Sequence, residues 1–183
     1  MGKLNDFSKS LAASNELLNN AIKNGSFIEW ICLESNQIDA LLRMGLIYRN
    51  QLDNNMSDID LKYLYQGEND KTISEKQIYG LAKEKGVIDE PTRSGLYLLY
   101  EERNKVIHRY IISEITTKRL LEIALEYTDF KEKIKKIIEE LEKEQIEKGV
   151  GMTIQRRKPK KEISDMISKM SVEKHGFGRE SMK

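Results

Sequence analysis

A stripe of apolar residues runs through the last long segment of the chain, residues 117–148. Its members step by three and four, which places them on one side of an α-helix: Leu120, Ala124, Tyr127, Phe130, Ile134, Ile137 and Leu141. The 183-residue chain has only two prolines and 7% aromatic residues, which disfavours a strand-rich fold with many turns. The sequence therefore predicts an all-α protein.

Local start and stop signals divide the chain into helices. Ser26 with Glu29, and Ser74 with Gln77, have the spacing of capping boxes, and Pro91 suits the first turn of a helix. The Asn-Gly pair at residues 24–25 and the glycines at 86 and 149 are typical helix ends, and Thr116 or Thr117 can cap the last helix. The expected helices span about residues 5–23, 26–51, 74–86, 91–112 and 117–148.

We expect residues 1–152 to form an antiparallel bundle of four to five helices, followed by a basic C-terminal extension over residues 153–183. The extension has nine basic and four acidic residues, whereas the first 152 residues have 22 basic and 26 acidic ones. A basic extension of this kind is typical of segments that contact phosphates or an acidic partner. The alternative interpretation is a solvated tail that its lysines keep soluble. The basic run within it contains Arg156, Arg157, Lys158, Lys160 and Lys161.

Several protein classes are disfavoured by simple counts. No stretch approaches the ~18 consecutive apolar residues of a membrane span, and the first residues lack the apolar core of a secretion signal. We therefore expect a cytoplasmic protein without membrane contact. A single Cys excludes an internal disulfide framework, and two His residues would need other ligands to hold a metal, so we expect neither metal nor cofactor.

Two charged residues fall on the apolar faces of their expected helices. Arg103 lies between Leu99 and Val106 on the apolar side of helix 91–112, and Glu34 falls within the apolar side of helix 26–51. Burying a charge costs several kcal/mol unless it is paired or opens to a wet cleft. One interpretation is a plain structural bundle in which an Arg103–Glu34 pair fixes helix register, and the other is a functional cleft.

Residues 103–110, Arg-Asn-Lys-Val-Ile-His-Arg-Tyr, resemble the signature of HEPN-domain ribonucleases. That signature has Arg, often a polar residue, and then His after three more positions, which Arg103, Asn104 and His108 match. HEPN toxins paired with minimal nucleotidyltransferase antitoxins add a Tyr two positions later, which Tyr110 matches. The resemblance covers about residues 26–148, whereas the linker at 53–74 and the extension exceed a minimal HEPN domain.

The resemblance implies a metal-independent endoribonuclease that acts as a toxin or an antiviral, abortive-infection effector. Two copies would face each other through their motif helices, and the products would carry 2′,3′-cyclic phosphate and 5′-hydroxyl ends. Arg103 would hold the phosphate, His108 would act as general acid or base, and Asn104 would orient the imidazole or bind the phosphate. Tyr110 would be the site where an antitoxin adds AMP, or simply a core or interface tyrosine. From the helical pattern alone, Glu34 could position Arg103.

The HEPN resemblance also implies which partners the protein binds. RNA is the expected substrate, a second copy of the chain the expected partner, and a protein or an RNA the possible antitoxin. Arg109 and the basic run of the extension are the expected RNA contacts, because lysine and arginine pair with phosphates. The alternative function is a non-catalytic HEPN-like helical module that binds RNA or a partner protein through its extension.

Overall fold

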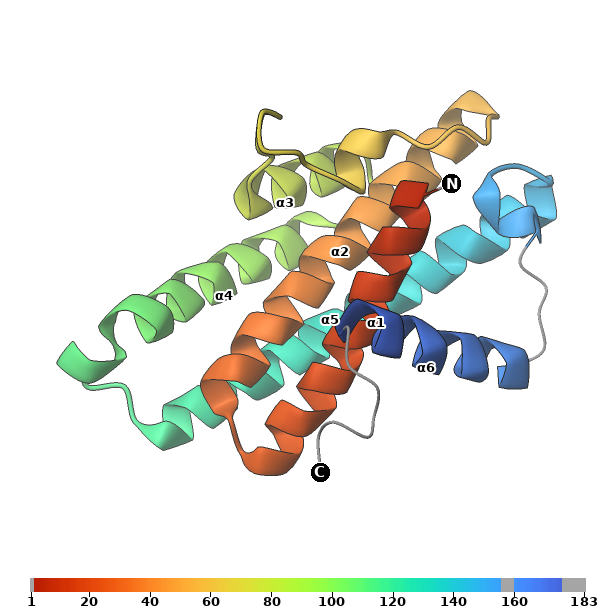
Figure 1. The fold of residues 1–183 in the computed structure, drawn as a ribbon. Helices are drawn as coiled ribbons and strands as arrows, with labels where there is room; N and C mark the ends of the chain where they lie inside the picture. The colour runs from red at the N-terminus through yellow and green to blue at the C-terminus, as the bar shows by residue number, and fades with distance from the viewer. Residues whose placement is uncertain (1, 156–159, 176–183) are drawn as a thin grey trace.

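The computed structural model describes residues 2–155 and 160–175, and all the secondary structure in this part of the chain is helical (Figure 1). The α-helices are α1 (Gly2–Asn24), α2 (Phe27–Asn54), α3 (Glu75–Glu84), α4 (Glu90–Arg109), α5 (Thr117–Lys148) and α6 (Lys160–His175). The short 3₁₀ helices are η1 (Leu61–Tyr63), η2 (Tyr110–Ile112) and η3 (Met152–Gln155). The all-α prediction is confirmed for these residues. None of their helices is both long and apolar enough to cross a membrane.

Most helix ends follow the predicted signals. The Ser74 hydroxyl accepts a hydrogen bond from the backbone N–H of Gln77, whose side chain accepts one from the backbone of Ser74, so this capping box is confirmed. Thr116 caps α5, and Gly149 ends it in the left-handed conformation with φ 65°. The capping box predicted at Ser26 is wrong, because its side chain makes no cap hydrogen bond. Its ψ of 71° differs from the extended ψ of 157–160° at the other two serine and threonine caps.

Helix α2 is the centre of the fold and packs against α1, α3, α4 and α5 (Figure 1). Helices α2 and α5 run in the same direction, because four side-chain contacts between them share one offset of 94 residues. These contacts join Glu34 to Thr128, Gln37 to Lys131, Tyr48 to Glu142 and Gln51 to Gln145. The prediction of a wholly antiparallel bundle is therefore wrong for this pair. After α2, the linker, α3 and α4 return the chain to the end of the fold where α2 begins. Helix α5 therefore starts at the same end as α2.

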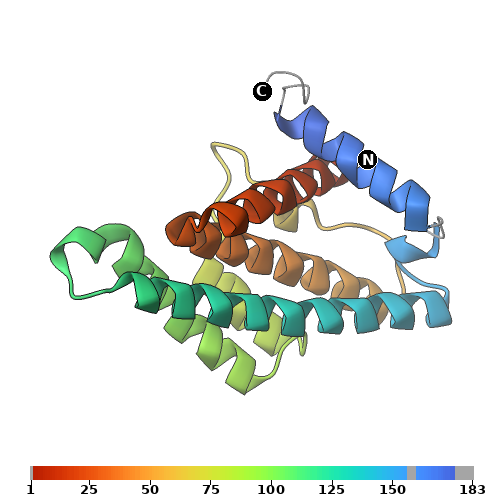
Figure 2. The same cartoon turned by 90° about the horizontal axis from the view of Figure 1, so that it is seen from below.

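Helices α4 and α5 run in opposite directions. Between α4 and α5, the Lys133 ammonium lies 2.5 Å from the Thr92 hydroxyl, while Arg119, earlier on α5, lies 3.5 Å from Glu102, later on α4. Helix α6 lies against α1 on the outside of the fold (Figure 2), where Lys9 pairs with Glu173 at 2.6 Å. One side of α4 packs against the other helices, and its opposite side lies on the surface of the molecule.

The core forms around the faces of α2 and α5 that meet each other. Burial of apolar side chains is the main source of stability for such a fold. The core side chains that are fully or almost fully enclosed include Ile31, Ile38, Leu42, Ile47, Ile78, Leu96, Ile123, Tyr127 and Ile134.

Two helical glycines should respond in opposite ways to alanine. A Cβ at Gly45 would lie 2.7 Å from a methyl of Val87 and 2.8 Å from a methyl of Ile138, whereas a Cβ at Gly80 meets no atom within 4 Å. Overpacking costs about 1–3 kcal/mol, and replacing a helical glycine gains up to about 1 kcal/mol. Urea unfolding should therefore show Gly45→Ala to be destabilised and Gly80→Ala to be stabilised. Equal stabilisation of both variants would contradict the tight α2–α5 packing.

Candidate functional site

Arg103 lies in the middle of α4, and its side chain is only 12% exposed. Its Nη1 donates hydrogen bonds to Glu75 Oε2 at 2.6 Å and to Ser35 Oγ at 3.0 Å. Its guanidinium carbon lies 4.7 Å from the centre of the Tyr100 ring, within the range of a cation–π interaction. The prediction that Arg103 lies on the apolar side of its helix is confirmed, and side chains from α2, α3 and α4 hold this half-buried residue.

The partner of Arg103 differs from the predicted one. The carboxylate of Glu34 is buried, but it faces α5, where its Oε2 lies 2.8 Å from Lys131 Nζ and its Oε1 accepts a hydrogen bond from Thr128. The predicted Arg103–Glu34 pair is therefore wrong. Successive residues of a helix are about 100° apart, so Ser35 faces α4 while Glu34 faces α5. Glu34 thus supports the α2–α5 contact rather than contacting Arg103.

Glu75, the first residue of α3, takes the place predicted for Glu34. One of its oxygens pairs with Arg103, and the other accepts a hydrogen bond from the hydroxyl of Tyr79. Burial alone would lower the pKa of Arg103, but the attraction and hydrogen bond of Glu75 outweigh burial and raise it. Burial, followed by the adjacent Glu75 carboxylate, raises the pKa of Tyr79. The arginine therefore stays charged, and the tyrosine stays a neutral hydrogen-bond donor.

The guanidinium of Arg103 retains unused hydrogen-bonding capacity. Nη2 reaches only Asn104 Oδ1, at a long 3.4 Å, and Nε is buried without a hydrogen-bond partner among the described residues. The buried hydroxyl of Tyr127 also lacks such a partner there. The Nη1 edge is thus fully engaged with the protein, while the Nη2 edge, next to Asn104, can bind a further acceptor such as a phosphate oxygen.

His108 lies in the last turn of α4 and is exposed, as is the neighbouring Arg109. Asn104 and His108 are four residues apart and therefore share a face of the helix. Arg103 and His108 are five residues apart, which turns their side chains about 140° from each other around the axis. Within one chain, the structure brings Arg103 to Asn104 and places His108 on the adjacent surface, without a hydrogen bond between Arg103 and His108.

Three large apolar side chains within four residues of His108 in the sequence are exposed. Ile107 is 44% exposed, and Ile111 and Ile112 of η2 are 95% and 81% exposed. We call these three residues the isoleucine patch. Neighbouring exposed side chains of this size at the end of a helix are typical of an interaction surface.

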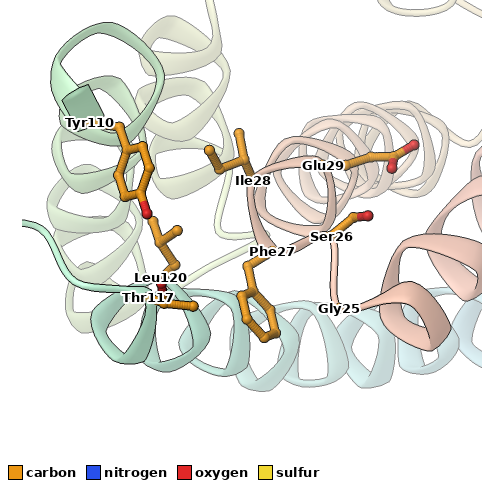
Figure 3. A pocket seen from close by; sticks show the side chains of 8 residues that line it. All are labelled: Gly25, Ser26, Phe27, Ile28, Glu29, Tyr110, Thr117 and Leu120. Atoms are coloured by element: carbon orange, nitrogen blue, oxygen red, sulfur yellow. The ribbon is translucent and has the colours of Figure 1, made fainter.

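Tyr110, the first residue of η2, is half-buried and lines a groove between the beginnings of α2 and α5 (Figure 3). Its hydroxyl points toward Leu120 of α5 (Figure 3). The groove is also lined by Gly25, Ser26, Phe27, Ile28, Glu29, Thr117 and Leu120.

The predicted RNA contacts in the extension are only partly covered by the structure. Lys160 and Lys161 begin α6, which packs against α1. The remaining three, Arg156, Arg157 and Lys158, lie outside the described residues. RNA binding by this run stays a prediction.

No family model, curated protein or solved structure matches this chain. Sequence reasoning missed Glu75 and Ser35 as partners of Arg103. In the sequence, Glu75 is sufficiently explained as an acidic residue in the first turn of a helix, where such residues are favourable. No sequence signal indicates that it pairs with an arginine 28 residues further along the chain.

Proposed function

We propose that the protein is a metal-independent HEPN-type endoribonuclease that acts as a homodimer. The observation that carries this proposal is the arrangement on α4: a charged Arg103 whose Nη2 makes only one long hydrogen bond, to Asn104, and an exposed His108 one turn after Asn104. A guanidinium can hold a phosphate through charged hydrogen bonds, and an exposed imidazole can exchange protons with a substrate near neutral pH.

The proposed reaction uses the RNA's own 2′-hydroxyl as the nucleophile. A bond forms between the 2′-oxygen and phosphorus, and the bond between phosphorus and the 5′-oxygen breaks. The 2′-hydroxyl gives up a proton and the departing 5′-oxygen takes one up; His108 performs one of these two transfers, as base or as acid, and water performs the other. Arg103 stabilises the charge that develops on the non-bridging oxygens, and Asn104 orients the imidazole or the phosphate. The products are a 2′,3′-cyclic phosphate and a 5′-hydroxyl.

Two copies of the chain are needed in this proposal because Arg103 and His108 diverge around α4 within one copy. A second α4 packed across a two-fold axis would cover the isoleucine patch and line one cleft with both copies of the motif. The exposure of Ile111 and Ile112 supports this arrangement. It matches the dimer implied by the HEPN resemblance.

Charge placed in the isoleucine patch should break the dimer. We expect the Ile111→Asp, Ile112→Asp double variant to run as a monomer in size-exclusion chromatography with light scattering, because buried unpaired carboxylates are costly, and to lose cleavage. Leu61→Asp, at another exposed apolar residue, is the control and should stay dimeric. A wild-type protein that is monomeric at micromolar concentration would contradict the dimer.

The ribonuclease proposal is tested by incubating purified protein with RNA in the presence of EDTA. Wild type should cleave, and Arg103→Ala should be slower by roughly 10²–10³-fold, as for loss of a donor that stabilises the transition state. Arg43→Ala is the matched control, because Arg43 is also 12% exposed and also pairs with a carboxylate, Asp39, at 2.6 Å. No cleavage by wild type, or equal rates for all three proteins, would refute the proposal.

Within this proposal the protein serves as a toxin or an abortive-infection effector in the cytoplasm, restrained by a protein or an RNA antitoxin. Tyr110 is the proposed position for AMP addition by a nucleotidyltransferase antitoxin. Because its hydroxyl points into the groove toward Leu120, modification would require the side chain to turn outward. A mass increase of one AMP on Tyr110, absent in Tyr110→Phe, would support this role.

A second candidate function is a non-catalytic module that binds RNA or a partner protein through the extension. It is favoured by the Arg103–Glu75 pair, which links α3 to α4 without any substrate. Under this alternative, glutamine at the five basic positions of residues 156–161 abolishes binding, whereas Arg103→Ala and His108→Ala leave binding unchanged.

A further inference from the structure

We propose that Glu75 is a positioning residue for Arg103: its carboxylate fixes the Nη1 edge of the guanidinium, so that the Nη2 edge beside Asn104 is presented to an RNA phosphate. This inference rests on the proposed ribonuclease function and extends it to a residue outside the motif. Glu75 lies on a different helix, 28 residues before Arg103.

The carboxylate of Glu75 is itself held from both sides. Oε2 accepts the 2.6 Å hydrogen bond from Arg103, and Oε1 accepts one from the hydroxyl of Tyr79, whose side chain is fully buried one turn along α3. The capping box between Ser74 and Gln77 fixes the first turn of α3, in which Glu75 lies. The carboxylate is therefore anchored by the fold of α3.

The guanidinium has one engaged edge and one available edge. Glu75 and Ser35 take up the donors of Nη1, at 2.6 and 3.0 Å, whereas Nη2 makes only the long contact with Asn104. Glu75 also balances the charge of Arg103, which is half-buried over the ring of Tyr100. Without that carboxylate, a half-buried guanidinium gains by swinging toward water, because an unpaired buried charge is costly. Its Nη2 edge would then lose its fixed direction.

A double-mutant cycle on the RNA cleavage rate tests this role. Glu75→Ala should lower kcat by roughly 10²-fold, the scale of a 1 Å misplacement of a catalytic group, but should have no further effect in an Arg103→Ala background. Glu75→Gln keeps one oxygen to accept from Arg103 but loses the charge and the second acceptor, so it should lower the rate by a smaller factor than Glu75→Ala. Glu84→Ala, an exposed carboxylate near the end of α3, is the control and should match wild type.

A readout independent of activity is the side-chain NMR signal of the Arg103 guanidinium. Its rotation about the Nε–Cζ bond should be slow in wild type and fast in Glu75→Ala. If Glu75→Ala does not fold, Tyr79→Phe takes its place, because it keeps both charges and removes only the hydrogen bond behind Glu75. It should lower the rate by a smaller factor, again only when Arg103 is present.

The possible outcomes separate this inference from the proposed function. If wild type cleaves RNA but Glu75→Ala lowers the rate equally with and without Arg103, Glu75 is only structural and the inference is overturned. A faster Glu75→Ala enzyme would also overturn it, because Glu75 would then compete with the phosphate. If wild type does not cleave and the Arg103 signal is the same with and without Glu75, both the function and the inference fail.

Discussion

Replacing His108 by alanine should lower the rate of RNA cleavage by roughly 10²–10⁴-fold, the range for loss of a general acid or base. The side chain is exposed at the end of α4, and no hydrogen bond or ion pair to another described residue holds it. We therefore expect its removal to change the free energy of unfolding by less than about 0.5 kcal/mol. The measurement is a cleavage time course, together with urea unfolding of the same preparation.

His175→Ala is the matched control for that experiment, since His175 is the only other histidine of the chain. Its Nε2 lies 3.9 Å from Glu16, in the contact between α1 and α6. It should cleave RNA at the wild-type rate. If His108→Ala cleaves as fast as His175→Ala, the imidazole on α4 takes no part in the reaction and the proposed chemistry is wrong.

Replacing Glu34 by alanine should be the most destabilising of the substitutions considered, with an expected loss of about 3–5 kcal/mol, the cost of breaking a buried ion pair. The Glu34 side chain is 1% exposed, and it accepts hydrogen bonds from Lys131, Thr128 and the indole N–H of Trp30. Its removal leaves the Lys131 ammonium without a carboxylate between α2 and α5. Urea unfolding followed by circular dichroism measures the loss.

Glu144→Ala provides the control, because Glu144 also bridges α5 to α2 but does so near the surface, where it pairs with Lys148 at 2.7 Å and with Arg49 of α2 at 3.6 Å. Exposed pairs of this kind contribute about 1 kcal/mol or less. Replacing Glu34 and Lys131 together by apolar residues should recover much of the loss, since no unpaired charge is then left. A Glu34→Ala variant no less stable than Glu144→Ala would show that the buried pair does not hold α2 against α5.

The sequence predicted α1 to α5 well because their signals are local, whereas α6 was not among the expected helices. The capping box at Ser74, the cap at Thr116 and the stop at Gly149 each depend on a few neighbouring residues. The relative direction of α2 and α5 could not be predicted in this way. It depends on how the linker, α3 and α4 return the chain, and no pattern within either helix records that path.

The site shows the same division between local and non-local information. Helical periodicity correctly placed Arg103 and Glu34 on buried faces, because periodicity reports which side of a helix a residue occupies. It does not report which helix lies opposite. One interpretation therefore paired the two charges with each other, whereas Glu34 meets Lys131 of α5 and Arg103 meets Glu75 of α3.

The chemical ends of the cleaved RNA test the central claim most directly. Purified protein is incubated in EDTA with an RNA of defined sequence and, separately, with the same RNA carrying 2′-deoxyribose at the cleaved positions. The masses of the fragments are then measured by mass spectrometry. Wild type should leave 2′,3′-cyclic phosphate and 5′-hydroxyl ends and should spare the deoxy positions, and Arg103→Ala should yield far less product. Fragments with 5′-phosphate ends, cleavage at the deoxy positions, or intact RNA would contradict the proposed reaction.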